Sequence, residues 1–338
     1  MGEDGSGGAW PGWVHKVASV SVGLVLVAVP VAVVAYGHYT DDGKPSGSPT
    51  SPGTPSGTAP SVSISSAPSS DATPGPGPDP LPTSTGETCV PGSLTDLTVV
   101  SFNIESAHGP DGSVQLDLLA RTLKAWKPDV VLLQEVDKNQ ARTGRVDMAS
   151  YLGQRLGFSS TFGANTANRA GGQYGTALLS RHPIVSAENT PLPRLPGDEQ
   201  RGLLHAVLDV DGAKLSAYVV HLQHTSSRAR MRQVNAIRRQ VADDPLPKVI
   251  GGDFNAHPGS SVMTVARSIA SDTWADVGTG PGLTVPRIAP RARIDYLLQT
   301  GLVPVNMQVL TPPLSDHRAL WARYGFSTTG AVCLPAFG

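Results

Sequence analysis

Short apolar runs alternate with segments of helical periodicity from about residue 97 onward. Residues 98–103 and 130–134 have the composition of buried strands. Apolar residues between them recur at helical spacing, which predicts a helix over Val114–Trp126 that ends before Pro128. A strand, a helix and a second strand in this order form a right-handed crossover, and the two strands then lie parallel.

The same two patterns continue through the rest of the domain. Asp211-Gly212 separates two of the predicted strands and is typical of a hairpin turn. Hairpins mixed with β-α units predict mixed sheets rather than a purely parallel one. Further helices are predicted over Met148–Leu156, Ser227–Val241 and Val262–Ile269, and further strands over Thr176–Ser180, Leu203–Leu208, Leu215–His221, Lys248–Gly251, Ile294–Leu298, Met307–Leu310 and Ala319–Tyr324.

An apolar run and a low-complexity stretch precede this domain. Val17–Tyr36 carries no charge and suffices to span a bilayer, for which roughly 20 apolar residues are needed. We expect an uncleaved membrane anchor with residues 1–16 in the cytoplasm; a signal peptide is the alternative, because Val33-Val34-Ala35 offers a cleavage site. Residues 37–88 are rich in Pro, Ser, Gly and Thr, which predicts a disordered stalk. Either alternative places residues 89–338 outside the cytoplasm.

Two cysteines, Cys89 and Cys333, bracket the globular part of the chain. In an oxidising compartment we expect a disulfide between them, and the alternative is a pair of free thiols. The formal net charge of the whole chain is −1 at pH 7, which is not the balance of a dedicated nucleic-acid binder. Aromatic residues make up only 5% of the chain, and this disfavours an aromatic hairpin that inserts into membranes.

Polar clusters follow several of the predicted strands. They contain Asn103, Glu135, Asp253 with Asn255, and Asp316 with His317, and Asp295 begins another strand. Carboxylate and amide oxygens are the ligands that Mg²⁺ and Mn²⁺ prefer. A histidine supported by an aspartate beside such a metal suits the hydrolysis of phosphate esters. Each cluster alone reads as an ordinary strand end or turn, but together they predict a catalytic site.

These clusters resemble, in sequence order, the motifs of the endonuclease/exonuclease/phosphatase superfamily. The resemblance covers about residues 97–324, and it implies a four-layer α/β sandwich of two mixed β-sheets flanked by helices. The residues that carry it are Ser101-Phe102-Asn103-Ile104, Leu133-Gln134-Glu135-Val136-Asp137, Tyr174–Arg181, His221-Leu222, Gly252-Asp253-Phe254-Asn255, Arg293-Ile294-Asp295-Tyr296 and Ser315-Asp316-His317.

The resemblance also implies roles for individual residues. It places Mg²⁺ or Mn²⁺ at Asn103, Glu135 and Asp316, catalytic groups at Asp253, Asn255, His317, Asp295 and His221, and substrate contacts at Tyr174, Arg201 and Arg228. Asp253 would orient or deprotonate the attacking water, and His317 paired with Asp295 would hold the phosphate. Thr176 stands where many relatives have Asn or Glu, and this leaves a partner of His221 unassigned.

We therefore expect a monomeric, metal-dependent phosphoesterase that acts outside the cytoplasmic membrane. Its substrate would be a phospholipid, a nucleic acid or a small phosphate ester, and Asn165–Gly172 and Pro191–Glu199 are candidate substrate loops. An extracellular endonuclease is one alternative. A catalytically silent binding module on the same fold is another, although such a module has no need of the metal and His/Asp positions.

Overall fold

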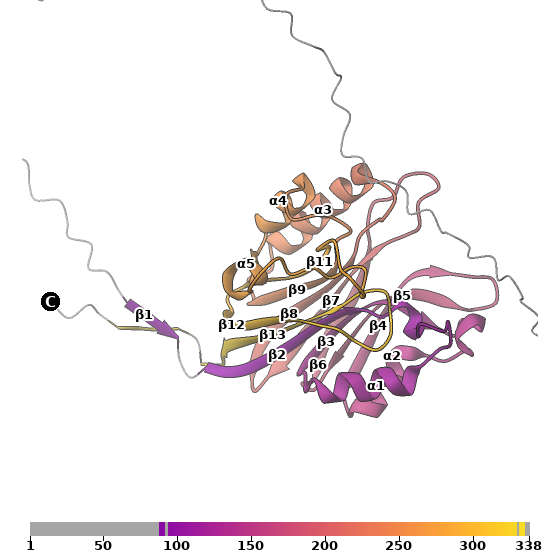
Figure 1. Ribbon diagram of the computed structural model, residues 1–338. Helices are drawn as coiled ribbons and strands as arrows, with labels where there is room; N and C mark the ends of the chain where they lie inside the picture. The colour runs from indigo at the N-terminus through magenta and orange to yellow at the C-terminus, as the bar shows by residue number, and fades with distance from the viewer. Residues whose placement is uncertain (1–87, 92–93, 330, 335–338) are drawn as a thin grey trace, which may run out of the picture. The chain divides into compact units, whose positions relative to one another are not determined.

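Two six-stranded mixed sheets form the centre of the domain (Figure 1). The computed structural model describes residues 88–91, 94–329 and 331–334. One sheet has the order β12-β13-β2-β3-β5-β4, and the other has the order β10-β11-β9-β8-β7-β6.

The strands of the first sheet are β2 (Leu94–Asn103), β3 (Val130–Lys138), β4 (Ser159–Ala167), β5 (Gln173–Ser180), β12 (Val303–Leu310) and β13 (Ala319–Ser327). Those of the second sheet are β6 (Ile184–Pro191), β7 (Gly202–Val210), β8 (Ala213–His221), β9 (Lys248–Asp253), β10 (Ser271–Asp272) and β11 (Asp295–Thr300). Below, the sheets are called the β2 sheet and the β9 sheet.

Helices cover the outer face of each sheet, so the layers run helix, sheet, sheet, helix (Figure 1). The β2 sheet carries α1 (Leu116–Ala125) and α2 (Met148–Leu156), and the β9 sheet carries α3 (Ser227–Ala242) and α4 (Ser261–Arg267). The short helix α5 (Thr273–Val277) and the 3₁₀ turns η1 (Glu105–Ala107) and η2 (Ala141–Thr143) lie in the connections. This is the expected four-layer arrangement.

Strand periodicity explains why the central strands are apolar along their whole length. Leu97 and Val99 of β2 point into the core between the two sheets, whereas Val100 and Phe102 point to the helical layer. Because both faces of the strand are covered, a polar residue on either face would lose its hydration. The apolar runs therefore end only at the strand termini, where the polar clusters begin.

The predicted connections are confirmed. Strands β2 and β3 are parallel and joined by α1, and β8 and β9 are parallel and joined by α3. Strands β7 and β8 form the antiparallel hairpin that turns at Asp211-Gly212, with Val210 opposite Ala213. The helix predicted over Val114–Trp126 is shorter, and several strands extend one to four residues beyond their predicted ends.

Sequence patterns missed β4, β6 and the two-residue β10, which are edge strands of the two sheets. Four consecutive residues of β6 are exposed, and β4 has one buried residue, Gly163. An edge strand with one face open to solvent does not need an apolar alternation, so the pattern that reveals central strands is absent there.

The two ends of the domain pair as an antiparallel ribbon of β1 (Thr88–Pro91) and β14 (Ala331–Leu334), with Cys89 opposite Cys333. This register brings the two backbones together, and the disulfide stays a prediction. The proposed anchor Val17–Tyr36 and the stalk lie outside the described residues. Among the described residues, no helix is both long and apolar enough to cross a membrane.

Candidate active site

Strand pairing brings the polar clusters to one edge of the sandwich. In the β2 sheet, Asn103 at the end of β2 pairs with Gln134, the neighbour of Glu135. In the β9 sheet, Asp253 at the end of β9 pairs with His221 at the end of β8 and with Asp295 at the start of β11. Carboxyl ends of parallel strands meet at one edge of a sheet, which is the common location of ligand sites in α/β proteins.

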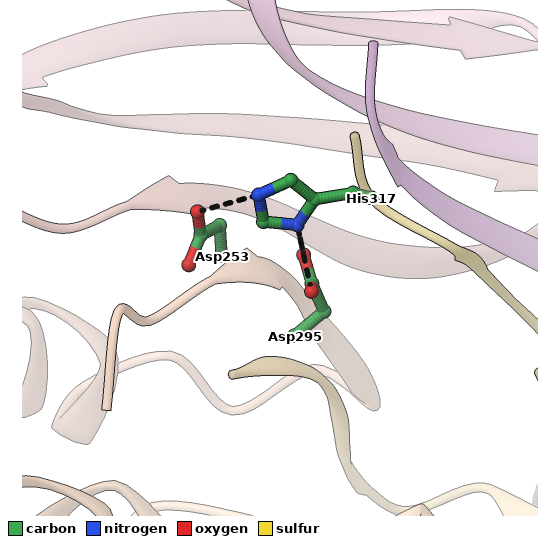
Figure 2. Close-up of side chains that lie close together, drawn as sticks. All are labelled: Asp253, Asp295 and His317. Carbon is green, nitrogen blue, oxygen red and sulfur yellow. Dashed lines mark hydrogen bonds and ion pairs between the residues drawn. The ribbon is translucent and has the colours of Figure 1, made fainter. Parts of the chain in front are cut away.

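Asp253 lies at the centre of the cluster. Its Oδ2 is 3.4 Å from Asn103 Nδ2, 3.6 Å from His221 Nε2 and 3.8 Å from His317 Nε2. Figure 2 shows Asp253 on one side of the imidazole of His317 and Asp295 on the other. All of these side chains are buried. Groups contributed by both sheets therefore converge on one carboxylate oxygen.

His317 is held as a cation by Asp295 (Figure 2). Its Nδ1 lies 2.9 Å from Oδ2 and 3.2 Å from Oδ1 of that carboxylate. Burial disfavours the charged imidazole, but the charge and hydrogen bond of Asp295, with help from Asp253, raise the pKa of His317 to about 10. The bond at Nδ1 fixes the ring, so that Nε2 faces Asp253.

The Asp253 carboxyl is unusually basic. Burial, followed by the negative charge of Asp295, raises its pKa to about 7, although the charge of His317 acts in the opposite direction. The backbone N–H of Asn255 donates to Oδ1 at 2.7 Å and orients the carboxylate. A carboxylate with a pKa close to the ambient pH is suited to accept a proton from water.

His221 has a partner that the sequence left unassigned. Arg201 Nη1 lies 3.1 Å from His221 Nδ1, and because a guanidinium only donates, Nδ1 must accept and Nε2 must carry the proton. Burial, followed by the charge of Arg201, holds the pKa of His221 well below its ordinary value, so this imidazole is neutral. The hydroxyl oxygen of Thr176 is buried without a hydrogen-bond partner and does not serve that histidine.

An acidic group adjoins the cluster on the side of the β2 sheet. Glu135 Oε1 accepts from Asn103 Nδ2 at 2.9 Å, and Asn103 Oδ1 accepts from the backbone N–H of Glu105 at 3.2 Å. Burial, then the charges of Asp316 and Glu135, raise the pKa of Glu105. Three carboxylates that repel one another next to an amide oxygen are the hard donor set that a divalent cation neutralises. The residues present therefore fit Mg²⁺ or Mn²⁺.

A second cluster could in principle take a cation, since one ligand atom from each of Asp253, Asp295 and His317 lies within 4.8 Å of the others. The geometry argues against it. Nδ1 of His317 is already occupied by Asp295, and a cationic imidazole repels a metal and has no free lone pair to offer. The carboxylates around Asn103 therefore fit a cation better than this second cluster does.

Of the remaining expected residues, Asn255 and Tyr174 interact with residues of the site, whereas Arg228 has no described contact with it. Asn255 lies beside Asp253, and its side-chain amide donates to Leu222 O at 3.0 Å. Burial, followed by the charge of Glu135, raises the pKa of Tyr174, whose ring centroid is 5.4 Å from the guanidinium carbon of Arg142. Arg228 is exposed on the first turn of α3, and no described contact joins it to the cluster.

Two further residues, Glu105 just after the first quoted motif and Ser315 of the last one, have contacts that the sequence did not reveal. Ser315 Oγ donates to Asn103 O at 2.7 Å and accepts from the backbone N–H of His317 at 3.1 Å. It thus joins the β2 sheet to the segment that carries the catalytic histidine. Glu105 adopts a left-handed backbone with φ of 46°, which turns the chain back toward Asp316. Only their place next to other polar residues could have indicated these contacts.

Residues 100–317, well over half of the 338-residue chain, match the model of the Endonuclease/Exonuclease/phosphatase family. The chain belongs to this family. Its members hydrolyse phosphate esters and generally need a divalent cation. The crystal structure of an endonuclease/exonuclease/phosphatase from Beutenbergia cavernae DSM 12333 is 25% identical, with a TM-score of 0.58, and the match covers 69% of this chain and 72% of that chain.

Two curated proteins of eukaryotes also resemble the chain. Protein cwh43 of Schizosaccharomyces pombe is 30% identical over 138 residues, which are 40% of this chain and 14% of that protein. Tyrosyl-DNA phosphodiesterase 2 of Xenopus laevis is 26% identical over 165 residues, which are 47% of this chain and 40% of that protein. The chain thus matches less than half of the length of either relative.

Proposed function

We propose that this chain is a divalent-metal-dependent phosphodiester hydrolase that acts outside the cytoplasmic membrane. The observation that carries the proposal is the convergence of a basic carboxylate and a cationic imidazole on one point, next to an acidic group that fits a cation. Asp253 Oδ2 lies 3.8 Å from Nε2 of His317, and Asn103 connects Asp253 to Glu135.

The residues of this site divide the reaction between them. Asp253 accepts a proton from water as the water oxygen attacks phosphorus, and the bond from phosphorus to the leaving oxygen breaks. His317 donates hydrogen bonds from Nε2 to a non-bridging oxygen, and Asp295 keeps it charged. Neutral His221 donates from Nε2 to the same phosphate. A divalent cation bound by Glu135, Asn103 and the neighbouring carboxylates would neutralise charge on the phosphate and the leaving alkoxide.

A small bis-aryl phosphodiester tests the catalytic assignment. Wild-type protein with Mg²⁺ should release nitrophenol, and Asp253→Ala and His317→Ala should each lower kcat by at least about a hundredfold, the lower bound for loss of a positioned proton-transfer group. Glu188→Ala serves as the control, because this carboxylate is exposed on edge strand β6. Turnover at the control rate in both site variants would reject the catalytic assignment of these residues, and a wild-type protein without turnover would favour the silent binding module.

The location of the cation has its own test. Glu135→Gln should weaken Mg²⁺ binding at least about tenfold by calorimetry, whereas Asp295→Asn should change it much less, because an altered metal shell costs about 10- to 100-fold in affinity. The opposite order would move the cation to the Asp253, Asp295 and His317 group.

The location outside the cytoplasm rests on the sequence of Val17–Tyr36, which supports an anchor followed by a stalk. Protease added to intact cells should release the domain by cutting within residues 37–88. A stalk that resists protease until the cells are broken would overturn this orientation.

A further inference from the structure

The outer face of α3 carries a row of exposed arginines. Arg228, Arg232 and Arg239, here called the α3 arginine face, lie on one side of the helix, because they are about one and about three turns apart. Arg238 is exposed beside them, and Arg194 is exposed in a loop that contacts α3, since Gln233 Nε2 donates to Pro193 O at 3.3 Å.

This face has no acidic counterpart. The helix itself contains no Asp or Glu, and none of the ion pairs found among the described residues includes a member of the α3 arginine face. Like charges at i and i+4, such as Arg228 and Arg232, destabilise a helix. A row of unpaired cations does not stabilise the fold, but it suits an anionic partner.

A shallow depression lies within the face. Its volume is about 440 Å³, and it is lined by Pro193, Met231, Arg232, Asn235 and Arg239.

 Met231, which packs against the core, and the side chains of Arg232 and Arg239 all line this depression. An apolar side chain together with planar cations suits an unstacked nucleobase.

Along the chain, the α3 arginine face begins a few residues after His221 of the catalytic cluster. Residues 222–226 connect His221 to α3, and Arg230 Nη1 holds this segment by donating to Gln223 O and His224 O, both at 3.0 Å. Arg201, which contacts His221, also lies 3.4 Å from His224 Nδ1 through its Nη2. From Arg228 to Arg239 the helix rises about 16 Å, so several phosphates of one strand can lie along it.

We propose that the α3 arginine face binds single-stranded nucleic acid, and that the bound strand reaches the cluster around Asp253 as the substrate. This inference rests on the proposed function for its catalytic part and on the α3 arginine face for its binding part. The arginines contact phosphates, and the depression receives a base. A duplex fits less well, because its bases are stacked inside the helix and cannot enter the depression.

The observations favour nucleic acid over an anionic membrane surface. Peripheral binding to a bilayer combines basic residues with apolar side chains that enter the interface. The large hydrophobic residues that are exposed in the described part of the chain are Leu94, Val185, Ile288, Val303 and Val305, and none of them lies on α3.

The binding part can be tested without catalysis. In EDTA, the affinity of the full chain for fluorescein-labelled oligothymidine and oligouridine is measured by anisotropy over a range of salt concentrations. Arg232→Gln combined with Arg239→Gln should weaken binding and make the slope of log K against log salt less steep by about 1.4, since each phosphate contact of a single strand contributes about 0.7. Arg232→Lys with Arg239→Lys should keep the slope and lose affinity, because lysine has no planar group to stack on a base.

The matched control is Arg121→Gln combined with Lys124→Gln, which removes the same charge from exposed positions on α1 in the other helical layer. This control should keep the wild-type slope, and thermal unfolding confirms that each variant is folded. Equal slopes in the two Gln pairs would overturn the proposal. Binding to phosphatidylglycerol vesicles without binding to either oligonucleotide would also overturn it, in favour of a membrane surface.

Failure of this inference is distinguishable from failure of the proposed function. A wild-type protein that hydrolyses the small diester but binds neither oligonucleotide refutes only the nucleic-acid proposal. A protein that binds the oligonucleotides with the expected slopes but hydrolyses no diester refutes the assignment of the bound strand as a substrate.

Discussion

Replacing Asp295 by asparagine should remove the interaction that keeps His317 protonated in the folded protein. The substitution keeps the size of the side chain and a group near Nδ1, but it removes the negative charge that faces the imidazole at 2.9 Å. Burial of the ring is unchanged and continues to disfavour the cation. The pKa of His317 should therefore fall from about 10 toward its ordinary value of 6.5.

The magnitude follows from the linkage between protonation and folding. His317 has its pKa raised on folding, so its contribution to stability is fully present below pH 6.5 and is lost as the pH rises through about 10. Between these limits the folded chain holds one proton more than the unfolded chain, and the free energy of unfolding should fall by about 1.4 kcal/mol per pH unit. From pH 7 to pH 9 the wild type should lose about 3 kcal/mol through this group.

The titration of Asp253 does not interfere with the measurement between pH 7 and pH 9. Its pKa is raised to about 7, so the stability linked to its proton is present below about pH 4 and is lost as the pH rises through 7. Above pH 7 the carboxylate is charged in both states. The slope between pH 7 and pH 9 therefore reports on the histidine.

Urea unfolding of both proteins in EDTA, at a series of pH values, measures the difference. Asp295→Asn should show a slope that is flatter by about 1.4 kcal/mol per pH unit. NMR of ¹³C-labelled histidine should show the ring of His317 still protonated at pH 8 in the wild type and neutral in the variant. Parallel slopes, or a variant in which this histidine stays protonated at pH 8, would refute the reasoning that Asp295 holds the charge.

Two further predictions concern backbone positions. Gly252→Ala should prevent folding or displace Asp253, because a Cβ there would lie 1.8 Å from Val220 O at a φ of +148°; soluble, fully active protein would contradict this. Cys89 and Cys333 should form a disulfide in protein exported to an oxidising compartment, seen as one linked peptide in a non-reducing digest, and its loss should cost about 2–5 kcal/mol of unfolding free energy. Recovery of both thiols from the exported protein would disprove the pairing.

The sequence was sufficient for the parts of the fold whose two faces are both covered. Central strands such as β3 and β9 contain a short apolar run that ends in polar residues, and the helices α1 and α3 have one apolar side, so both kinds of element leave a clear pattern. Edge strands have no such requirement, which is why β4 and β6 were not predicted. The relative placement of the two sheets came from the resemblance, because no local pattern specifies which sheets face each other.

Residue identity predicted most of the cluster but not its contacts. Asn103, Asp253 and His317 were quoted as motif residues, and strand pairing brings them together as the sandwich requires. The contact of Arg201 with His221 joins the start of β7 to the end of β8, and no pattern within either strand predicts it. Arg228 shows the converse, because it follows His221 closely in sequence but is exposed and has no described contact with the cluster.

The site depends on the packing of the two sheets against each other. The β2 sheet supplies the acidic group with Glu135, the β9 sheet supplies Asp253 and Asp295, and Asn103 Nδ2 bridges them at 2.9 and 3.4 Å. The contact of His317 with Asp295 at 2.9 Å makes a second bridge, because His317 lies in the β12–β13 connection of the β2 sheet, where Ser315 ties it to Asn103 O. A shift of one sheet over the other would lengthen both bridges at once. The apolar core between the sheets therefore sets how closely Glu135 and Asp253 approach each other, and close packing of that core maintains the geometry on which the proposed reaction depends.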